Sequence, residues 1–231
     1  MPNFHDVFGN IAVFGMIHLS GNDIFGRALE ELCLYADEGL DGAIIENYHC
    51  RNLKILEEVL KAAQGFIFDG MLLGVNILPN DYERAMELAS TYGARFVQID
   101  YISGNYEHSP QIDPDHYLET KAQFPELVVL GGVHPKYYTP VEGSNLRQDL
   151  AEGIQRTEAV VVTGEGTGIS TPLEKIVQFR DMIESHPLIV GAGLTHRNAY
   201  NQLLHANGCI VGSCFKPNKD TSATLNSTRI R

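Results

Sequence analysis

Eight short apolar segments recur along the chain, and segments with helical periodicity separate them. Apolar runs of roughly four to eight residues bounded by glycine are typical of strands buried on both faces. We expect strands at residues 11–19, 42–46, 71–77, 95–100, 127–133, 159–163, 188–191 and 209–211. The roughly 3.6-residue period of an amphipathic helix predicts helices at residues 24–38, 52–64, 80–92, 116–123, 145–156 and 195–205, and one more opened by Ser170-Thr171-Pro172.

This alternation of strand and helix predicts an α/β fold, a single (β/α)8 TIM barrel that spans residues 1–231. The rival is an open doubly wound sheet. The first strand, however, leads into G-M-I-H-L-S-G and not into the dinucleotide-binding fingerprint G-x-G-x-x-G. A polar loop at residues 101–114 follows the fourth strand and is a candidate flap over a site.

Residues 217–231 form a polar C-terminal tail with weak helical character. We therefore expect the final outer helix of the barrel to be short or missing. Apolar surface left open there would suit a second copy of the chain, which predicts a homo-oligomer. Disorder of the tail is the alternative.

Glycine turns follow the last three predicted strands. Backbone at such turns approaches a ligand closely and offers N–H groups to an anion, and turns after the last strands of a barrel commonly bind phosphate. We expect the phosphate site to consist of Gly164, Gly166, Gly191, Gly193, Gly212 and Ser213. Tight turns without a ligand are the structural alternative.

Polar residues stand at the carboxyl ends of the strands, where reactive groups of such barrels gather. We expect catalytic roles for His18, Glu46, Asp100 and Lys136, and substrate-binding roles for Asn47, Asn76, His134 and Thr163. Helix capping by Asn47, a core position for His18 and a loop position for Lys136 are the plain alternatives.

Glu46 is the strongest of these candidates, because a carboxylate at the end of G-A-I-I-E either faces a polar mouth or is desolvated. Isolation would raise its pKa toward the range of a general base. Lys136 would stabilise negative charge, with a Schiff base as the alternative. Cys214 is a further possible nucleophile, although a small residue beside the phosphate turn explains it equally well.

We expect no cofactor. A divalent metal held by His18, Glu46, Asp100 and His134 is the alternative, but no H-x-x-x-H or H-E-x-x-H pattern fixes such a site.

The chain has a formal net charge of −12, which argues against a nucleic-acid surface and against adhesion to anionic lipid. Its four cysteines form no C-x-x-C pair, which favours the reduced, intracellular state. The N-terminal residues M-P-N-F-H-D lack a signal-peptide pattern, and no apolar run reaches the roughly 18 residues of a membrane span. We expect a soluble cytoplasmic protein whose partner is a phosphorylated small molecule.

Motifs spread over nearly the whole chain resemble those of the BtpA family, also called BtpA/SgcQ. They are G-M-I-H-L at 15–19, G-L-D-G-A-I-I-E-N at 39–47, G-V-N-I-L-P-N-D at 74–81, V-H-P-K at 133–136, V-V-T-G-E-G-T-G at 161–168, V-G-A-G-L-T at 190–195 and I-V-G-S-C-F-K at 210–216. The chain departs from that pattern at Gln98, Asp100, Gly132 and Tyr137, where family members tend to carry Arg, Asn, Asp and His.

The resemblance implies a phosphate-binding type of TIM barrel. Family members are linked to photosystem I biogenesis, and others lie in sugar-metabolism gene clusters and are presumed enzymes. Our first hypothesis is an enzyme acting on a sugar phosphate or nucleotide-like compound by isomerase or lyase chemistry, a choice that rests on fold analogy. The second is a non-catalytic assembly or regulatory protein, which a mouth plugged by Tyr106 or Tyr137 would favour.

Overall fold

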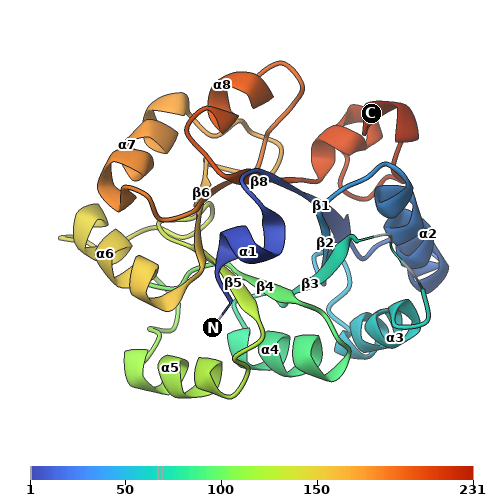
Figure 1. Ribbon diagram of the computed structural model, residues 1–231, viewed down its shortest axis with the longest axis horizontal. Coiled ribbons are helices and arrows are strands. Elements are labelled where there is room, and N and C mark those ends of the chain that lie inside the picture. Colours follow the sequence, from blue (N-terminus) through green and yellow to red (C-terminus); the bar gives the residue numbers. More distant parts are fainter. Residues whose placement is uncertain (1, 67, 69, 231) are drawn as a thin grey trace.

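The computed structural model describes residues 2–66, 68 and 70–230 and has a closed barrel of eight parallel strands at its centre (Figure 1). Each strand pairs with the next one in the sequence, and β8 pairs with β1 to close the barrel. The strands are β1 (Ala12–His18), β2 (Gly42–Glu46), β3 (Leu72–Asn76), β4 (Phe96–Ile99), β5 (Val128–Gly132), β6 (Ala159–Thr163), β7 (Leu188–Gly191) and β8 (Gly208–Val211). The predicted (β/α)8 barrel is therefore confirmed.

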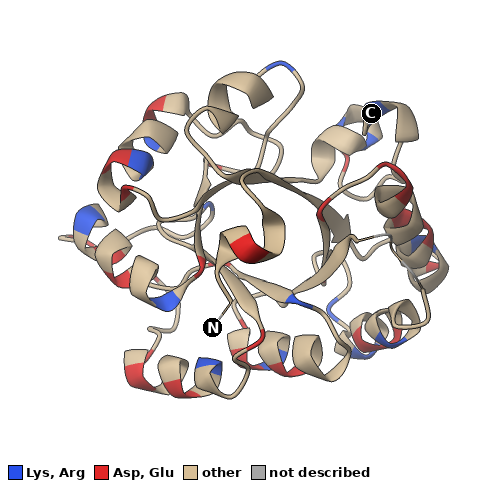
Figure 2. Cartoon of the chain, viewed as in Figure 1, with Lys and Arg blue, Asp and Glu red and all other residues tan. Residues whose placement is uncertain are grey.

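A ring of helices surrounds the barrel, one between each pair of successive strands (Figure 1). They are α2 (Ile24–Asp37), α3 (Leu53–Ala63), α4 (Tyr82–Thr91), α5 (Pro114–Ala122), α6 (Leu146–Arg156), α7 (Leu173–Ile183) and α8 (Ala199–Leu203). Asp and Asn side chains cap several helix starts, as Asp23 and Asp81 do for α2 and α4. Acidic residues are spread over these outer helices together with lysines and arginines (Figure 2).

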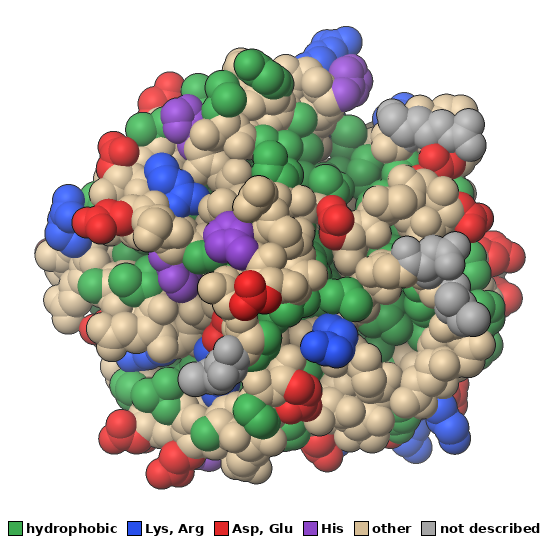
Figure 3. Space-filling model, in the orientation of Figure 1, with side chains coloured by type: hydrophobic (Ala, Val, Ile, Leu, Met, Phe, Trp, Pro, Cys, Tyr) green, Lys and Arg blue, Asp and Glu red, His purple; other side chains and the backbone are tan. Residues whose placement is uncertain are grey.

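A short helix, α1 (Phe4–Phe8), closes the N-terminal end of the barrel, and the sequence analysis did not predict it. The Phe8 ring lies 4.9 Å from the ring of Phe14 and 5.4 Å from that of Phe96, both inside the barrel. Gly74 makes room for Phe96, because a Cβ at Gly74 would lie 2.3 Å from that ring. Side chains cover the centre of this face in Figure 3.

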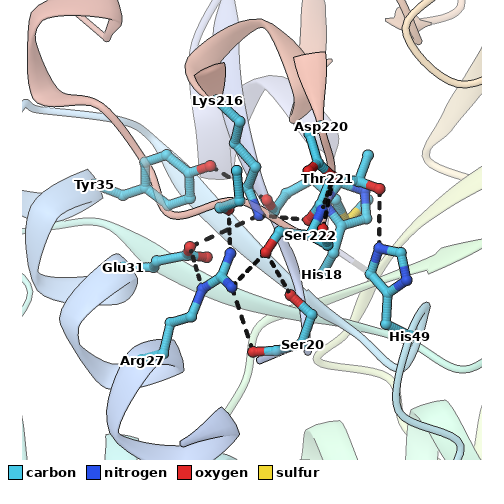
Figure 4. Close-up of polar contacts among 12 residues, drawn as sticks. His18, Ser20, Arg27, Glu31, Tyr35, His49, Lys216, Asp220, Thr221 and Ser222 are labelled. Atoms are coloured by element: carbon cyan, nitrogen blue, oxygen red, sulfur yellow. Dashed lines mark hydrogen bonds and ion pairs between the residues drawn. The ribbon is translucent and has the colours of Figure 1, made fainter. Parts of the chain in front are cut away.

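After β8 the described chain contains three short 3-10 turns and no α-helix: η1 (Ser213–Phe215), η2 (Pro217–Lys219) and η3 (Ser227–Arg229). The prediction of a short or missing final helix is confirmed. We call residues 216–230 the C-terminal strap. Arg27 on α2 donates to the carbonyl oxygens of Ser222 and Ala223, which fastens the strap to the barrel wall (Figure 4).

The strap also fills the space that a final helix would cover. Phe215, just before the strap, is buried, and Leu225 and Ile230 of the strap are partly buried against the core. Lys216 is fully buried, where its Nζ donates to the Thr221 carbonyl (Figure 4). The open surface from which we expected a homo-oligomer is therefore covered within the chain.

The loop between β4 and α5 does not form the flap that we expected. Tyr101, Ile102 and Tyr106 are buried in it. Arg156 on α6 donates to the Ile102 carbonyl, so the loop packs against α6. Within the described residues, no helix has both the length and the apolar character needed to cross a membrane.

Candidate active site

A pocket opens at the carboxyl ends of the strands, opposite α1. It holds about 710 Å³, including space open to solvent at its mouth. Its walls come from the ends of seven of the eight strands and from the loops that follow them: Met16, His18, Glu46, Gln98, Asp100, Gly132, Pro135, Lys136, Tyr137, Val161, Thr163, Thr167, Gly168, Gly191, Ala192, Gly193, Ile210, Gly212 and Ser213.

One side of the pocket consists of backbone from the loops after β6, β7 and β8. Gly193 has φ +67°, and a Cβ there would lie 2.1 Å from the Ile169 carbonyl oxygen. Gly168 has φ +77°, and a Cβ there would lie 3.1 Å from Oγ of Ser213. Only glycine allows these loops to approach each other so closely, which leaves their backbone accessible to a ligand.

Two lysines flank the tip of the β6–α7 loop. Nζ of Lys136, after β5, donates to Oγ1 of Thr167 at 2.9 Å. Nζ of Lys219, on the strap, donates to the carbonyl of Gly168 at 3.3 Å. Two neighbouring loop residues thus bind cations from two different segments, which gives this side of the pocket a local positive charge in an acidic protein.

The other side of the pocket begins with three neighbouring strand ends. His18 is the register partner of Glu46, and Glu46 is the register partner of Asn76. All three side chains are buried. Parallel pairing thus brings residues from three separate sequence motifs to one level of the barrel.

The side-chain amide of Asn76 donates hydrogen bonds to the acceptor oxygens on this side of the pocket. Its Nδ2 lies 2.8 Å from Oε1 of Glu46 and 3.4 Å from Oδ1 of Asp100, and it also donates to Oε1 of Gln98. An amide group has only two hydrogens, so the three acceptors compete for them. The other oxygen of Asp100 accepts a hydrogen bond from the Tyr138 hydroxyl at 3.0 Å.

Burial, the largest cause, raises the pKa of Glu46, Lys136 lowers it, the charge of Asp100 raises it and the Asn76 hydrogen bond lowers it, and the net result is a pKa of about 7. Glu46 therefore exchanges a proton close to neutral pH, as a general acid or base requires.

Burial holds the pKa of His18 well below its usual range, with further lowering by Lys216 and Lys136. Its Nε2 lies 3.8 Å from Oε2 of Glu46, but a neutral imidazole forms no ion pair there. His18 Nδ1 and Asn76 Oδ1 are buried without a hydrogen-bond partner among the described residues.

Thr163 lies in the pocket wall as we expected, and it also positions Lys136. Its hydroxyl oxygen accepts a hydrogen bond from the backbone N–H of Lys136 at 2.7 Å. Nζ of Lys175 on α7 donates to the carbonyls of Thr163 and His134, which ties the ends of β5 and β6 together.

Three predicted substrate-binding residues lie outside the pocket wall: Asn76, which lies behind it and is bound to Glu46, and His134 and Asn47. Nε2 of His134 lies 2.7 Å from Oδ2 of Asp149 on α6, so its side chain binds the outer helix. Asn47 exchanges two hydrogen bonds with the backbone of Leu78 and holds the β3–α4 loop. Both side chains are engaged by other parts of the protein, and their substrate-binding roles stay predictions.

Two of the predicted phosphate-binding glycines also lie outside the wall. A Cβ at Gly164 would lie 3.1 Å from the Ser170 carbonyl, and one at Gly166 would lie 3.2 Å from Ile169, so both shape the β6–α7 loop. Thr167 and Gly168 of the same loop line the pocket in their place. Gly191, Gly193, Gly212 and Ser213 lie where we expected them.

The four predicted metal candidates do not meet, because His134 points to α6. In the part of the chain that the structure describes, no three His, Cys, Asp or Glu side chains are arranged to hold a metal ion.

The sequence pattern of the BtpA family matches residues 12–231. The chain belongs to the BtpA family. Photosystem I biogenesis protein BtpA of Synechocystis sp. is 24% identical over 243 residues, which cover 94% of this chain and 85% of that protein.

Solved structures similar to this BtpA-family chain are (β/α)8 barrels. Phosphoribosyl anthranilate isomerase from Thermus thermophilus superimposes with a TM-score of 0.64 at 13% identity, covering 95% of this chain and 94% of that one. Phosphoribosyl anthranilate isomerase in complex with reduced 1-(o-carboxyphenylamino)-1-deoxyribulose 5-phosphate gives a TM-score of 0.59 at 15% identity, covering 95% and 94%. At such identities the likeness shows the fold.

Several wall residues of this BtpA-family protein had no role assigned from its sequence, among them Gln98, Thr167 and Gly168, and neither had Lys219, which contacts Gly168. A polar residue inside the apolar strand F-V-Q-I, two positions before Asp100, was an available signal for Gln98. Thr167 and Gly168 belong to the same glycine-rich loop as the predicted residues. No local pattern places Lys219 beside that loop, because the contact spans 51 residues.

Proposed function

We propose that this protein is an enzyme that acts on a phosphorylated small molecule, a sugar phosphate or a nucleotide-like compound, by isomerase- or lyase-type acid–base chemistry. One observation carries the proposal: the same pocket has glycine backbone and Lys136 on one side, where the exposed Lys219 also donates to Gly168, and a carboxyl group with a pKa of about 7 on the other. A phosphate would lie at the loops after β6 to β8, and the reacting carbon near Glu46.

Four side chains of the site have separate roles in the proposed reaction. Glu46 takes a proton from a carbon or hydroxyl of the substrate and returns it, and Asp100 assists from the end of β4. Neutral His18 orients or polarises a substrate oxygen, because an uncharged imidazole still offers one N–H donor. Lys136 stabilises the negative charge that develops in the transition state.

One comparison and one feature of the chain itself support the phosphate part of the proposal. A structural neighbour, phosphoribosyl anthranilate isomerase, was solved with a 5-phosphate ligand. Its likeness to this chain is one of fold, so the ligand class is transferred here by analogy. The glycine backbone and the lysines at the loops after β6 to β8 are features of this chain's own residues.

The first test is a binding screen with phosphorylated sugars and nucleotides, followed by a search for turnover of each compound that binds. Glu46→Gln should bind the same compound and fail to turn it over. Full turnover by Glu46→Gln would disprove the acid–base role of Glu46.

A second candidate is a non-catalytic assembly or regulatory protein, favoured by the name of the Synechocystis relative. Tyr137 is 66% exposed at the mouth, and its hydroxyl accepts a hydrogen bond from the backbone N–H of Thr167. Tyr106 is buried away from the pocket wall, and its hydroxyl oxygen accepts a hydrogen bond from the backbone N–H of His134. Binding of a phosphorylated compound without turnover would favour this candidate over the enzyme.

A further inference from the structure

The pocket wall beside β2 and β4 is rich in fixed acceptor oxygens. Glu46 and Asp100 both line it, and Asn76 beneath them donates to each. Tyr138 holds the second oxygen of Asp100. Because protein donors hold both carboxyl groups in place, they keep their positions when a ligand binds.

The charges on this wall are not balanced once a phosphate is bound. Lys136 is the cation with the largest opposing effect on Glu46, yet its ammonium group lies beside Thr167 on the phosphate side. A phosphate bound there would share that positive charge. The two carboxylates would then face the ligand with their own charge largely uncompensated.

Two buried polar atoms on this side of the pocket lack a hydrogen-bond partner within the described part of the chain. Nδ1 of His18, a residue of the pocket wall, and Oδ1 of Asn76 have no partner among the described residues. Oδ1 of Asn76 is an acceptor, so a ligand that brings a hydrogen-bond donor to it gains affinity, whereas Nδ1 of a neutral imidazole donates or accepts according to its tautomer.

We propose that the end of the substrate remote from its phosphate carries hydroxyl or amino donors and no carboxylate. The substrate is then a polyol or amino-sugar phosphate, as opposed to a phosphorylated carboxylic acid. This inference rests on the proposed function, because it assumes that the phosphate binds beside β6 to β8.

The proposal separates this protein from its structural neighbour. The ligand named in the phosphoribosyl anthranilate isomerase complex carries a carboxyphenyl group. A carboxylate directed at Glu46 and Asp100 would be repelled at short range. The shared barrel fold is therefore no reason to expect a carboxylate on the substrate of this protein.

Isothermal titration at pH 9, well above the pKa of about 7 of Glu46, tests the proposal with matched ligands. Glucose 6-phosphate, glucosamine 6-phosphate and 6-phosphogluconate share a six-carbon chain and a phosphate, and only the last carries a carboxylate. Glycerol 3-phosphate and 3-phosphoglycerate form a shorter pair, and inorganic phosphate probes the phosphate side alone. We expect each carboxylate compound to bind at least about tenfold more weakly than its partner.

Asp100→Asn should narrow the difference between 6-phosphogluconate and glucose 6-phosphate. The asparagine oxygen can still accept the Tyr138 hydrogen bond, and the charge is lost together with the 3.4 Å contact from Asn76. Glu119→Gln, an exposed change on α5, is the matched control and should leave the ratio unchanged.

Equal or tighter binding of 6-phosphogluconate by the wild type would overturn this inference and leave the proposed function intact, since a phosphate compound would still bind. Failure of inorganic phosphate and of every phosphorylated compound to bind would overturn the proposed function and this inference together.

Discussion

Nε2 of His18 lies 3.8 Å from Oε2 of Glu46, and both side chains are almost completely buried. Burial acts on the two groups in the same sense, since it keeps the imidazole neutral and makes the carboxyl group hold its proton up to about pH 7. The pair can therefore exchange a proton with a substrate without creating a buried charge on the histidine.

The first prediction concerns the pH dependence of turnover. If Glu46 acts as the base, the rate for an identified substrate should rise with pH and level off above about 7, because the carboxyl group must first lose its proton. Glu46→Gln should lower kcat by roughly 10²- to 10⁴-fold. Glu119→Gln should keep both the rate and its pH profile, and a wild-type profile that is flat from pH 5 to 9 would contradict the assignment.

The second prediction concerns stability. The pKa of Glu46 is raised from 4.5 to about 7 in the folded protein, so folding is favoured by the bound proton. That contribution is complete below about pH 4.5 and is lost as the pH rises through about 7. Glu46→Gln stays neutral and keeps an acceptor for Asn76. Its free energy of unfolding should exceed that of the wild type by up to about 3 kcal/mol above pH 7, and by little below pH 4.5. Urea titrations across this range would show a constant difference if the burial of Glu46 were irrelevant.

The third prediction concerns the two lysines beside the β6–α7 loop. Lys136→Met and Lys219→Met should each weaken the binding of a phosphorylated ligand by about tenfold or more, because each removes a cation from the anion side. Lys61→Met, an exposed change on α3, provides the control. Unchanged affinity in both pocket variants, measured by titration at low ionic strength, would place the anion elsewhere.

The fourth prediction compares two glycine-to-alanine changes at positive φ: one also brings the new Cβ against a neighbouring loop, and the other only strains the backbone. Gly193→Ala would bring a Cβ within 2.1 Å of the Ile169 carbonyl, so the loops after β6 and β7 must move apart and phosphate binding should be lost. Gly93→Ala has a similar positive φ, with no atom within 4 Å of the new Cβ. It should cost roughly 1–2 kcal/mol in stability and leave binding intact. Equal binding by both variants would disprove the role of this turn.

The fifth prediction concerns the C-terminal strap. Arg27→Met removes the hydrogen bonds to Ser222 and Ala223, and it leaves Glu31 and Lys216 buried without the guanidinium (Figure 4). The strap should become sensitive to limited proteolysis. Arg84→Met, which removes a surface arginine from α4, should leave the strap as resistant as in the wild type. Equal resistance of both variants would show that other contacts hold the strap.

The barrel was predictable because its signals are local. Each apolar run ends at a glycine or polar residue, and each helix has its own apolar face, so the order of elements follows from short windows. The helix α1 has only five residues, F-H-D-V-F, too few for a periodic signal, and its burial depends on the distant Phe14 and Phe96.

The site was predictable only where residues extend from strand ends. Glu46 and His18 fall into register because parallel strands align their carboxyl ends. His134 also follows a strand, but its backbone has φ +45° and its ring pairs with Asp149 on the outer helix. Lys219, in the short 3-10 turn η2 of the strap, contacts the carbonyl of Gly168 in the β6–α7 loop. Such contacts depend on loop geometry, which residue patterns do not encode.

Binding of a phosphorylated ligand in the pocket is the central claim, and thermal unfolding tests it most directly. Wild type and the Lys136→Met/Lys219→Met double variant would be compared with inorganic phosphate and a panel of phosphorylated sugars and nucleotides. We predict that at least one class stabilises the wild type, by about 2.7 kcal/mol at a hundredfold excess over Kd, and that the double variant loses the effect. No stabilisation of the wild type, or equal stabilisation of both proteins, would contradict the claim.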